Sequence, residues 1–287
     1  MKQKIVFFGS SRYVIPIIEV LKKNFDLSLV ITTEQNPSNP IPHFCNKNKI
    51  KYISVTSLNN SIVNDQLSMV NCQLAILADF GLIIPKRVLK IFQKGIINIQ
   101  PSLLPKYRGP TPVQNAILNG ENMTGISIIK LDDKVDHGPI LAQKEEKILE
   151  DDTADTLYAR LFEIGADLIY QNIKHYIKGY LKPRQQIHSK ATFTKLLQKN
   201  DGLINLDNPP SPIKIARMIR AYHPWPGVWT KLQIVAGSTR GVDVQKIIKF
   251  LPEQKIQVEG KNPVSYKDFT NGYSKGKDIL EKLKLTI

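Results

Sequence analysis

The chain of 287 residues has only two cysteines, Cys45 and Cys72, and no short spacing relates them. Its five histidines also lack the Cys-x₂-Cys and His-x₃-His spacings from which most structural metal sites are built. We therefore expect neither a disulfide nor a bound metal ion.

Long apolar runs are missing as well. The apolar run near the N-terminus spans only residues 5–8, which is too short for a signal peptide, and no segment approaches the roughly 20 apolar residues of a membrane helix. The sequence therefore predicts a cytoplasmic protein with no membrane partner.

A glycine-rich phosphate loop is also lacking. The first predicted strand, at 4–8, ends at Gly9, but the Gly-x-Gly-x-x-Gly spacing does not follow it. A dinucleotide-binding site of the usual kind is therefore poorly supported.

Positive charge is abundant and unevenly distributed. Of the net charge of +15, residues 1–182 contribute 22 basic and 17 acidic side chains, whereas residues 183–287 contribute 18 basic and 8 acidic ones. The C-terminal excess favours a polyanionic partner, nucleic acid first, although solubility alone also accounts for a positive balance.

Strand and helix patterns alternate through the first 182 residues. Apolar β-type runs at 4–8, 27–33, 51–55, 73–78 and 95–99 alternate with helical patterns, and 124–131 and 139–148 read as further extended segments. A long amphipathic helix is predicted over 153–178. This order predicts an α/β fold with a doubly wound, mainly parallel sheet in a domain of residues 1–182.

The remaining chain has a different pattern. Residues 183–205 are polar without a sustained period and are predicted to be a linker. Residues 206–287 begin with a helix at 211–221 and continue with short alternating runs, which predicts a small antiparallel β-barrel of the OB type.

The most informative stretch is Gly95-Ile-Ile-Asn-Ile-Gln-Pro-Ser-Leu-Leu-Pro-Lys-Tyr-Arg-Gly109. Its β-branched start predicts a buried strand, and Pro101 and Pro105 prevent regular structure beyond it. Because side chains alternate along a strand, Asn98 and Gln100 are expected on one face near its carboxyl end, where α/β proteins place binding sites. Two isolated amides would more simply tie down the loop.

Asp136 lies in the segment Val135-Asp136-His137-Gly138, between two extended segments. Taken alone, it is typical of a turn aspartate. Adjacent side chains on a strand diverge, so His137 is expected at the rim of any site that Asp136 joins.

Together these segments resemble the folate-dependent formyltransferases. The residues that carry the resemblance are the Asn98 to Gly109 stretch and the Val-Asp-x-Gly segment ending at Gly138. Further segments resemble the methionyl-tRNA formyltransferases in order and spacing: Phe7-Phe-Gly-Ser-Ser11, Phe80-Gly-Leu-Ile-Ile-Pro85, Ile219-Arg-Ala-Tyr-His-Pro-Trp-Pro226 and Glu259-Gly-Lys-Asn-Pro263. The resemblance covers nearly the whole chain.

The resemblance implies a Rossmann-like formyltransferase domain that uses 10-formyltetrahydrofolate as donor and the α-amine of methionyl initiator tRNA as acceptor. It assigns catalysis to Asn98, Gln100 and Asp136, with Asn98 as donor to the oxyanion and Asp136 as the carboxylate. It also implies a monomer whose residues 206–287 bind tRNA. The implied folate-binding residues are Ser102, Leu103, Leu104, Pro105, Phe80, Gly81 and Leu82.

Gln100 departs from the family's pattern, which has its catalytic histidine at this position. A glutamine amide donates a neutral hydrogen bond but cannot become a cation or shuttle a proton. Losing an oxyanion donor typically costs roughly 10²–10³-fold in rate, and losing a general acid or base roughly 10²–10⁴-fold. We therefore expect impaired transfer.

A second departure is the loop between Val30 and Phe44, which has no lysine or arginine where the family usually has a longer basic loop. This loop and Gln100 leave two alternatives open. One is a sugar-nucleotide N-formyltransferase, which shares the first domain; the other is a catalytically inactive relative that binds folate or tRNA.

Overall fold

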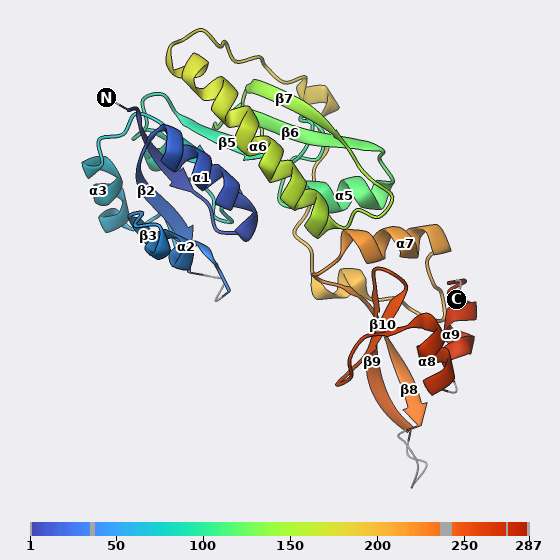
Figure 1. The fold of residues 1–287 in the computed structure, drawn as a ribbon. Coiled ribbons are helices and arrows are strands. Elements are labelled where there is room, and N and C mark those ends of the chain that lie inside the picture. The colour runs from blue at the N-terminus through green and yellow to red at the C-terminus, as the bar shows by residue number, and fades with distance from the viewer. Residues whose placement is uncertain (1, 35–37, 236–242, 274, 286–287) are drawn as a thin grey trace. The chain divides into compact units, whose positions relative to one another are not determined.

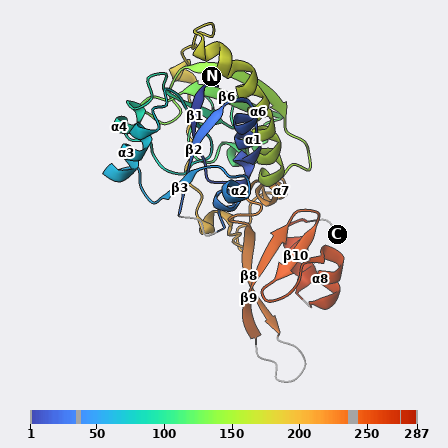
Figure 2. The same cartoon turned by 60° about the vertical axis from the view of Figure 1, so that its left-hand side comes forward.

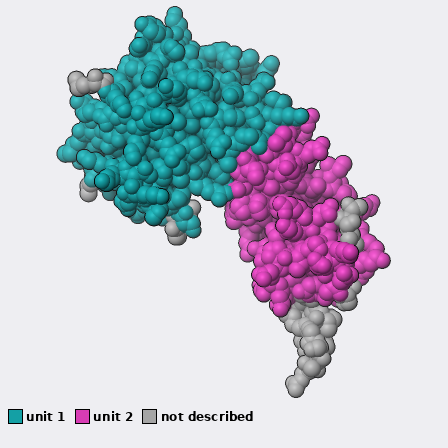
Figure 3. All heavy atoms as spheres, viewed as in Figure 1, with its two compact units in different colours: residues 1–112, 123–147, 158–195 teal, residues 113–122, 148–157, 196–287 magenta. Residues whose placement is uncertain are grey.

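The computed structural model describes residues 2–34, 38–235, 243–273 and 275–285, which form two compact units (Figure 3). Unit 1 comprises residues 1–112, 123–147 and 158–195, and unit 2 comprises residues 113–122, 148–157 and 196–287. Each unit therefore contains segments that are far apart in the sequence.

In its described part, unit 1 is built on a sheet with the strand order β3-β2-β1-β4-β5-β6-β7 (Figure 1). The pairs from β3 to β5 are parallel, and β5–β6 and β6–β7 are antiparallel. The predicted mainly parallel, doubly wound sheet is confirmed. The strands are β1 (Lys4–Phe8), β2 (Asp26–Thr33), β3 (Tyr52–Val55), β4 (Ala75–Leu77), β5 (Ile96–Gln100), β6 (Met123–Lys130) and β7 (Ile140–Lys147).

Helices cover both faces of this sheet. Figure 2 shows α1 and α6 on one side of the strands and α3 and α4 on the other. A Cβ on Gly165 of α6 would lie 2.8 Å from Ile99 Cγ2, so glycine lets this helix approach β5 closely. The helices are α1 (Ile15–Asn24), α2 (Ile41–Lys47), α3 (Ser61–Met69), α4 (Lys86–Leu89) and α6 (Ala154–Ile177).

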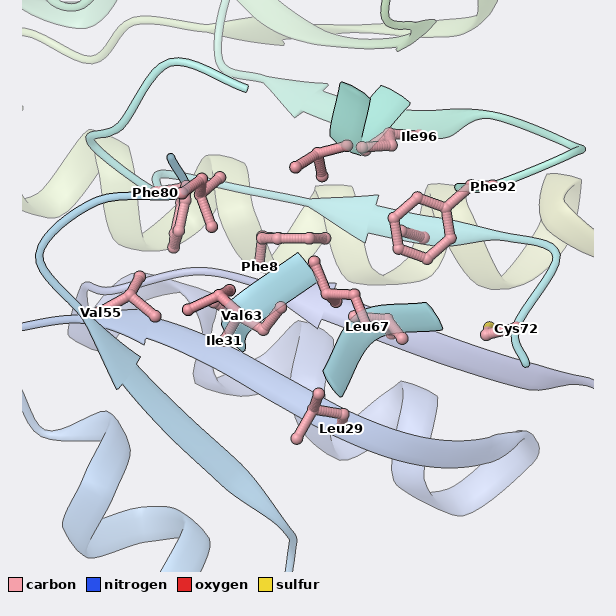
Figure 4. Packing of buried hydrophobic residues seen from close by; sticks show 14 residues of the cluster. Phe8, Leu29, Ile31, Val55, Val63, Leu67, Cys72, Phe80, Phe92 and Ile96 are labelled. Atoms are coloured by element: carbon pink, nitrogen blue, oxygen red, sulfur yellow. The ribbon is translucent and has the colours of Figure 1, made fainter. Parts of the chain in front are cut away.

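The side of the sheet beneath α3 and α4 is packed with aromatic and aliphatic side chains (Figure 4). The ring of Phe8 meets Phe80 and Phe92 edge-on, with centroid distances of 5.3 and 6.2 Å. Val63 and Leu67 of α3 belong to the same buried cluster. Strands covered on both faces need continuous apolar runs, which is the pattern seen at residues 5–8.

Unit 2 contains a second, antiparallel sheet with the order β11-β10-β9-β8. The predicted small antiparallel β-barrel is thus confirmed as a separate antiparallel sheet, and its closure into a barrel is not observed among the described residues. Within the described residues β8 and β11 are the outer strands of this sheet, which does not close on itself, and the outer side of β8 pairs only with the segment at Leu203 and Ile204. Its strands are β8 (Val228–Val235), β9 (Asp243–Leu251), β10 (Lys255–Val258) and β11 (Val264–Ser265). The helices of this unit are α5 (Pro112–Asn119), α7 (Pro212–Ala221), α8 (Tyr266–Gly272) and α9 (Gly276–Lys282).

The stretch 183–205, predicted to be a linker, instead pairs through its main chain. Arg184 and Ile140 exchange hydrogen bonds of 2.7 and 2.8 Å in unit 1, and Arg108 donates to Thr192 at 2.8 Å. In unit 2, Ile204 donates to the carbonyl of Trp229 at 2.8 Å. Main-chain pairing to irregular loops leaves no side-chain period, so the sequence pattern gave no sign of it.

No helix in the described part of the chain combines the length and apolar character needed to cross a membrane.

Candidate active site

Asn98 and Gln100 lie two residues apart on β5, as the strand period predicts. Both side chains are buried. Their strand pairs with β4 on one side and β6 on the other, so the two amides lie toward the end of a central strand.

The carboxylate of Asp136 joins this pair of amides from the loop between β6 and β7. Its Oδ1 accepts a hydrogen bond from Asn98 Nδ2 at 3.3 Å, and its Oδ2 accepts one from the main-chain N–H of Gly109 at 2.7 Å. The side chain is only 8% exposed, so Asp136 is a buried group rather than a solvated turn residue.

Gly109 links Gln100 to Asp136. Its N–H donates to Asp136, and its carbonyl accepts from Gln100 Nε2 at 3.1 Å. Gly109 has φ of +108°, and a Cβ there would lie 2.9 Å from the carbonyl oxygen of Thr194. Only glycine combines this backbone conformation with this close approach.

Burial raises the pKa of Asp136 to about 6. The Gly109 N–H, the Arg108 guanidinium and the Asn98 amide oppose this rise because they stabilise the carboxylate. A carboxyl group with this pKa is mostly ionised at neutral pH and can still accept a proton there.

Two residues that the sequence analysis did not assign, Arg108 and Gln186, clamp the loop of Asp136. Gln186 Oε1 accepts from Arg108 Nε at 3.2 Å and from Nη2 at 2.6 Å. Gln186 Nε2 donates to the carbonyls of Asp136 and Gly138 at 2.8 and 2.7 Å. Arg108 lies within the quoted stretch, so the sequence could have indicated it, whereas Gln186 lies in the predicted linker and carries no local signal.

Two stacked histidines lie beside this clamp. The rings of His137 and His188 are 4.0 Å apart and nearly parallel, and Arg108 Nη2 lies 2.9 Å from His188 Nδ1. The His137 side chain is 26% exposed, and its Nδ1 lies 2.6 Å from Asp132 Oδ2. His137 therefore contacts Asp132 rather than the carboxylate of Asp136.

The loop of residues 102–105 is fixed against β6 and β7. Leu104 N donates to Ser127 Oγ at 3.0 Å, Ser127 Oγ donates to the carbonyl of Ser102 at 2.6 Å, and Gln143 Nε2 donates to the carbonyl of Leu104 at 2.9 Å. The side chains of Ser102 and Leu104 are buried, whereas Leu103 and Pro105 are half-buried. Of the predicted folate residues in this loop, Leu103 and Pro105 therefore have the accessible side chains.

The neighbouring loop of residues 80–82 divides in the same way. The ring of Phe80 belongs to the apolar cluster of Figure 4 and is 2% exposed, so it contributes to the core and not to a pocket wall. Gly81 has φ of +82° and open space where a Cβ would be, and Leu82 is half-buried. A ligand at this loop would therefore meet Gly81 and Leu82.

Comparison with known proteins identifies the family of the chain. A sequence profile of the formyl transferase family matches residues 4–173. A methionyl-tRNA formyltransferase of Chloroflexus aurantiacus is 39% identical over 236 residues, which cover 79% of this chain and 76% of the relative. One of Roseiflexus castenholzii is 32% identical over 304 residues, covering 95% and 96%.

The chain belongs to the methionyl-tRNA formyltransferase family. It is accordingly a one-carbon group transferase by descent. Solved structures share the fold: a sugar N-formyltransferase from Shewanella has a TM-score of 0.66 at 20% identity and covers 88% of this chain and 98% of its own. A 4-N formyltransferase from Francisella tularensis has a TM-score of 0.67 at 18% identity, with the same coverage.

The clamp residue of this formyltransferase can be tested by Gln186→Ala. We expect a loss of about 3 kcal/mol in the free energy of unfolding, because the buried Arg108 guanidinium and two carbonyls lose their partner. Denaturant titration measures it, with the exposed neighbour Gln185→Ala as the matched control. Equal stability of the two variants would show that the clamp contributes nothing.

The raised pKa of Asp136 predicts a pH dependence of stability. Between pH 3.8 and about 6 the unfolded chain has lost this proton while the folded chain keeps it, so rising pH destabilises the fold in this window. Relative to Asp136→Asn, the wild type is expected to lose about 2 kcal/mol from pH 4 to 7 and almost nothing further above. Parallel unfolding titrations at both ends of the window measure the difference; a pH-independent one would place the pKa near its usual value.

Proposed function

We propose that the chain transfers the formyl group of 10-formyltetrahydrofolate to the α-amine of methionyl initiator tRNA, at a rate limited by Gln100. The observation that supports it most is the buried carboxylate of Asp136, held by the Asn98 amide and the Gly109 N–H. An amine that attacks a formyl carbon must lose a proton, and the formyl oxygen gains charge. The carboxylate of Asp136 is suited to accept the proton, and the Asn98 amide is suited to donate a hydrogen bond to the charged oxygen.

Asp136 is the proton acceptor in this proposal. Its pKa of about 6 leaves it ionised at neutral pH, yet close enough to neutrality for proton transfer. Asn98 donates one amide hydrogen to this carboxylate, and its second amide hydrogen has no partner among the described residues. That hydrogen is the donor we assign to the developing oxyanion.

The donor folate supplies an electrophilic formyl carbon, and the loops at 80–82 and 102–105 are the segments we assign to it. Gly81 fits this assignment because the space where its Cβ would lie is open, so the main chain there is accessible to a ligand. The loop at 102–105 fits because Ser127 and Gln143 hold its main chain in place. Leu82, Leu103 and Pro105 would provide the apolar contacts.

We assign tRNA affinity mainly to residues 206–287. The C-terminal 105 residues hold most of the excess positive charge, and the loop between Val30 and Phe44 holds none. The relatives named for methionyl-tRNA support this choice of acceptor.

Single-turnover formyl transfer to charged initiator tRNA, at saturating donor, tests the proposal. A dTDP-amino sugar serves as the competing acceptor, because it stands for the sugar-nucleotide alternative. Transfer to tRNA alone supports the proposal, and transfer to the sugar alone replaces it. If folate and tRNA bind without transfer to either acceptor, the chain is an inactive relative.

A further inference from the structure

Unit 2 contains a hollow of about 380 Å³ on one face of the β8–β10 sheet, whose strands are labelled in Figure 1. It belongs to unit 2 alone, and none of the residues assigned above to catalysis or folate lines it. Its polar and aromatic lining consists of Lys199, Trp225, Trp229, Lys249, Gln257 and Glu259.

Both tryptophans of the chain line this hollow. Trp229 is only 7% exposed and is held from two sides, since its Nε1 donates to the carbonyl of Lys199 at 3.1 Å and its own carbonyl accepts from Ile204 N at 2.8 Å. Trp225, by contrast, is 56% exposed. A fixed indole beside an exposed one provides an apolar surface that a flat ring can cover.

Two lysines border the same hollow. Lys199 Nζ lies 5.8 Å from the centre of the Trp229 ring, and Lys249 faces Trp229 in the β8–β9 register. Within the described residues, neither lysine has a carboxylate partner. A Cβ on Gly202 would lie 1.8 Å from the carbonyl of Gly227, so glycine is required for the Lys199 segment to pack here.

Hydrogen-bond acceptors complete the lining. Glu259 Oε2 accepts from Ile247 N at 3.1 Å, and Gln257 Nε2 donates to the carbonyl of Lys261 at 3.1 Å. Each side chain therefore keeps one oxygen without a partner among the described residues. These oxygens match the amino and imino groups on the edge of a nucleobase.

We propose that this hollow binds one unpaired nucleotide of RNA, with the base against Trp225 and the flanking phosphates on Lys199 and Lys249. Aromatic surfaces bordered by cations are how proteins bind single-stranded nucleic acid, because every base has a face for stacking and every linkage has a charge. The choice of RNA rests on the proposed function, which brings tRNA to this chain. The net positive charge of the C-terminal residues favours the same partner.

The position of the two tryptophans provides a direct assay, since all tryptophan emission of the protein comes from this hollow. The full chain is titrated with a single-stranded adenosine RNA hexamer, and we expect saturable quenching of the emission. Trp225→Ala is expected to weaken binding about 5- to 150-fold, because one base loses its stacking partner. Trp225→Phe keeps an aromatic ring and is expected to restore most of the affinity.

The contribution of the lysines to RNA affinity is tested by Lys249→Ala. Loss of one phosphate contact should lower the slope of log affinity against log salt by about 0.7. Lys267→Ala removes an exposed lysine of α8 outside the hollow and should lower the slope less. A double-stranded RNA of the same length should not quench, because its bases are paired. Quenching by duplex RNA, or equal affinity of Trp225→Ala and wild type, would overturn the proposal.

Failure of this inference is distinguishable from failure of the proposed function. Quenching by the hexamer without any formyl transfer would leave the nucleotide site in place and remove the catalytic proposal. Transfer to charged tRNA, with emission that does not respond to RNA, would remove the nucleotide site alone.

Discussion

Asp136→Asn is expected to reduce single-turnover formyl transfer by at least about 10²-fold. The carboxylate accepts from two donors, Asn98 Nδ2 and Gly109 N–H, and an asparagine has one amide oxygen for them. Its NH₂ group would face the other donor and could accept no proton from the attacking amine. General-base catalysis typically contributes about 10²–10⁴-fold, which sets the expected loss.

The matched control is Asp133→Asn in the same loop. Asp133 is half-exposed and pairs with Lys86 at 2.8 Å, away from the contacts of Asp136. Transfer is measured with donor and charged tRNA at saturation, so that binding differences do not enter the rate. Full activity of Asp136→Asn would show that this carboxylate has only a structural role in the loop.

The strand that carries the site was predictable because its local signals agree. Three isoleucines indicate a buried strand, the following prolines end it, and the period of two places Asn98 beside Gln100. The structure adds that Asn98 bonds Asp136 directly, whereas Gln100 is linked to Asp136 through Gly109. The contact between Asn98 and Asp136 joins residues almost 40 positions apart in the sequence. A pattern within one short segment cannot predict such a contact.

The burial of Asp136 shows what the sequence left out. Its segment has the composition of an exposed turn, and its φ of +45° is typical of an aspartate in such a turn. Its main-chain carbonyl is held by Gln186, from a stretch whose polar composition predicted a linker. Polar side chains that donate to main-chain carbonyls have no periodic spacing. Composition therefore indicated an exposed turn for Asp136 and a linker for Gln186, although both side chains are buried.

Phe80 lies in the core, although the family resemblance assigned it to folate binding. Phe80 follows a strand in a stretch with a family resemblance, which favoured a pocket wall, but its ring packs edge-on against Phe8.

A short helix at 41–47 and the helices at 266–282 also escaped prediction, although Ser265 accepts from the N–H of Asp268 as an N-cap. Short helices hold few apolar positions, so tertiary packing decides them.

Gln100→His is expected to raise the rate of formyl transfer by about 10²-fold or more, equivalent to about 2.7 kcal/mol in the barrier. Gln100 is 8% exposed and donates to the Gly109 carbonyl at 3.1 Å. An imidazole N–H can make the same hydrogen bond, and its other nitrogen can carry a proton near neutral pH. A group that bears charge beside the developing oxyanion matters chiefly in the transition state, so folate and tRNA affinities should stay nearly constant.

The test compares wild type, Gln100→His and Gln100→Asn in single-turnover transfer, with both ligand affinities measured separately. Asparagine keeps a neutral amide and should give no gain, so a gain with histidine alone identifies the protonatable ring as the cause. If histidine gives no gain while both ligands still bind, the site has diverged at more than one residue, and the inactive relative becomes the better description. High transfer in the unmodified chain would instead show that a neutral donor suffices, because the Asp136 carboxylate then performs the proton transfer without a cationic partner.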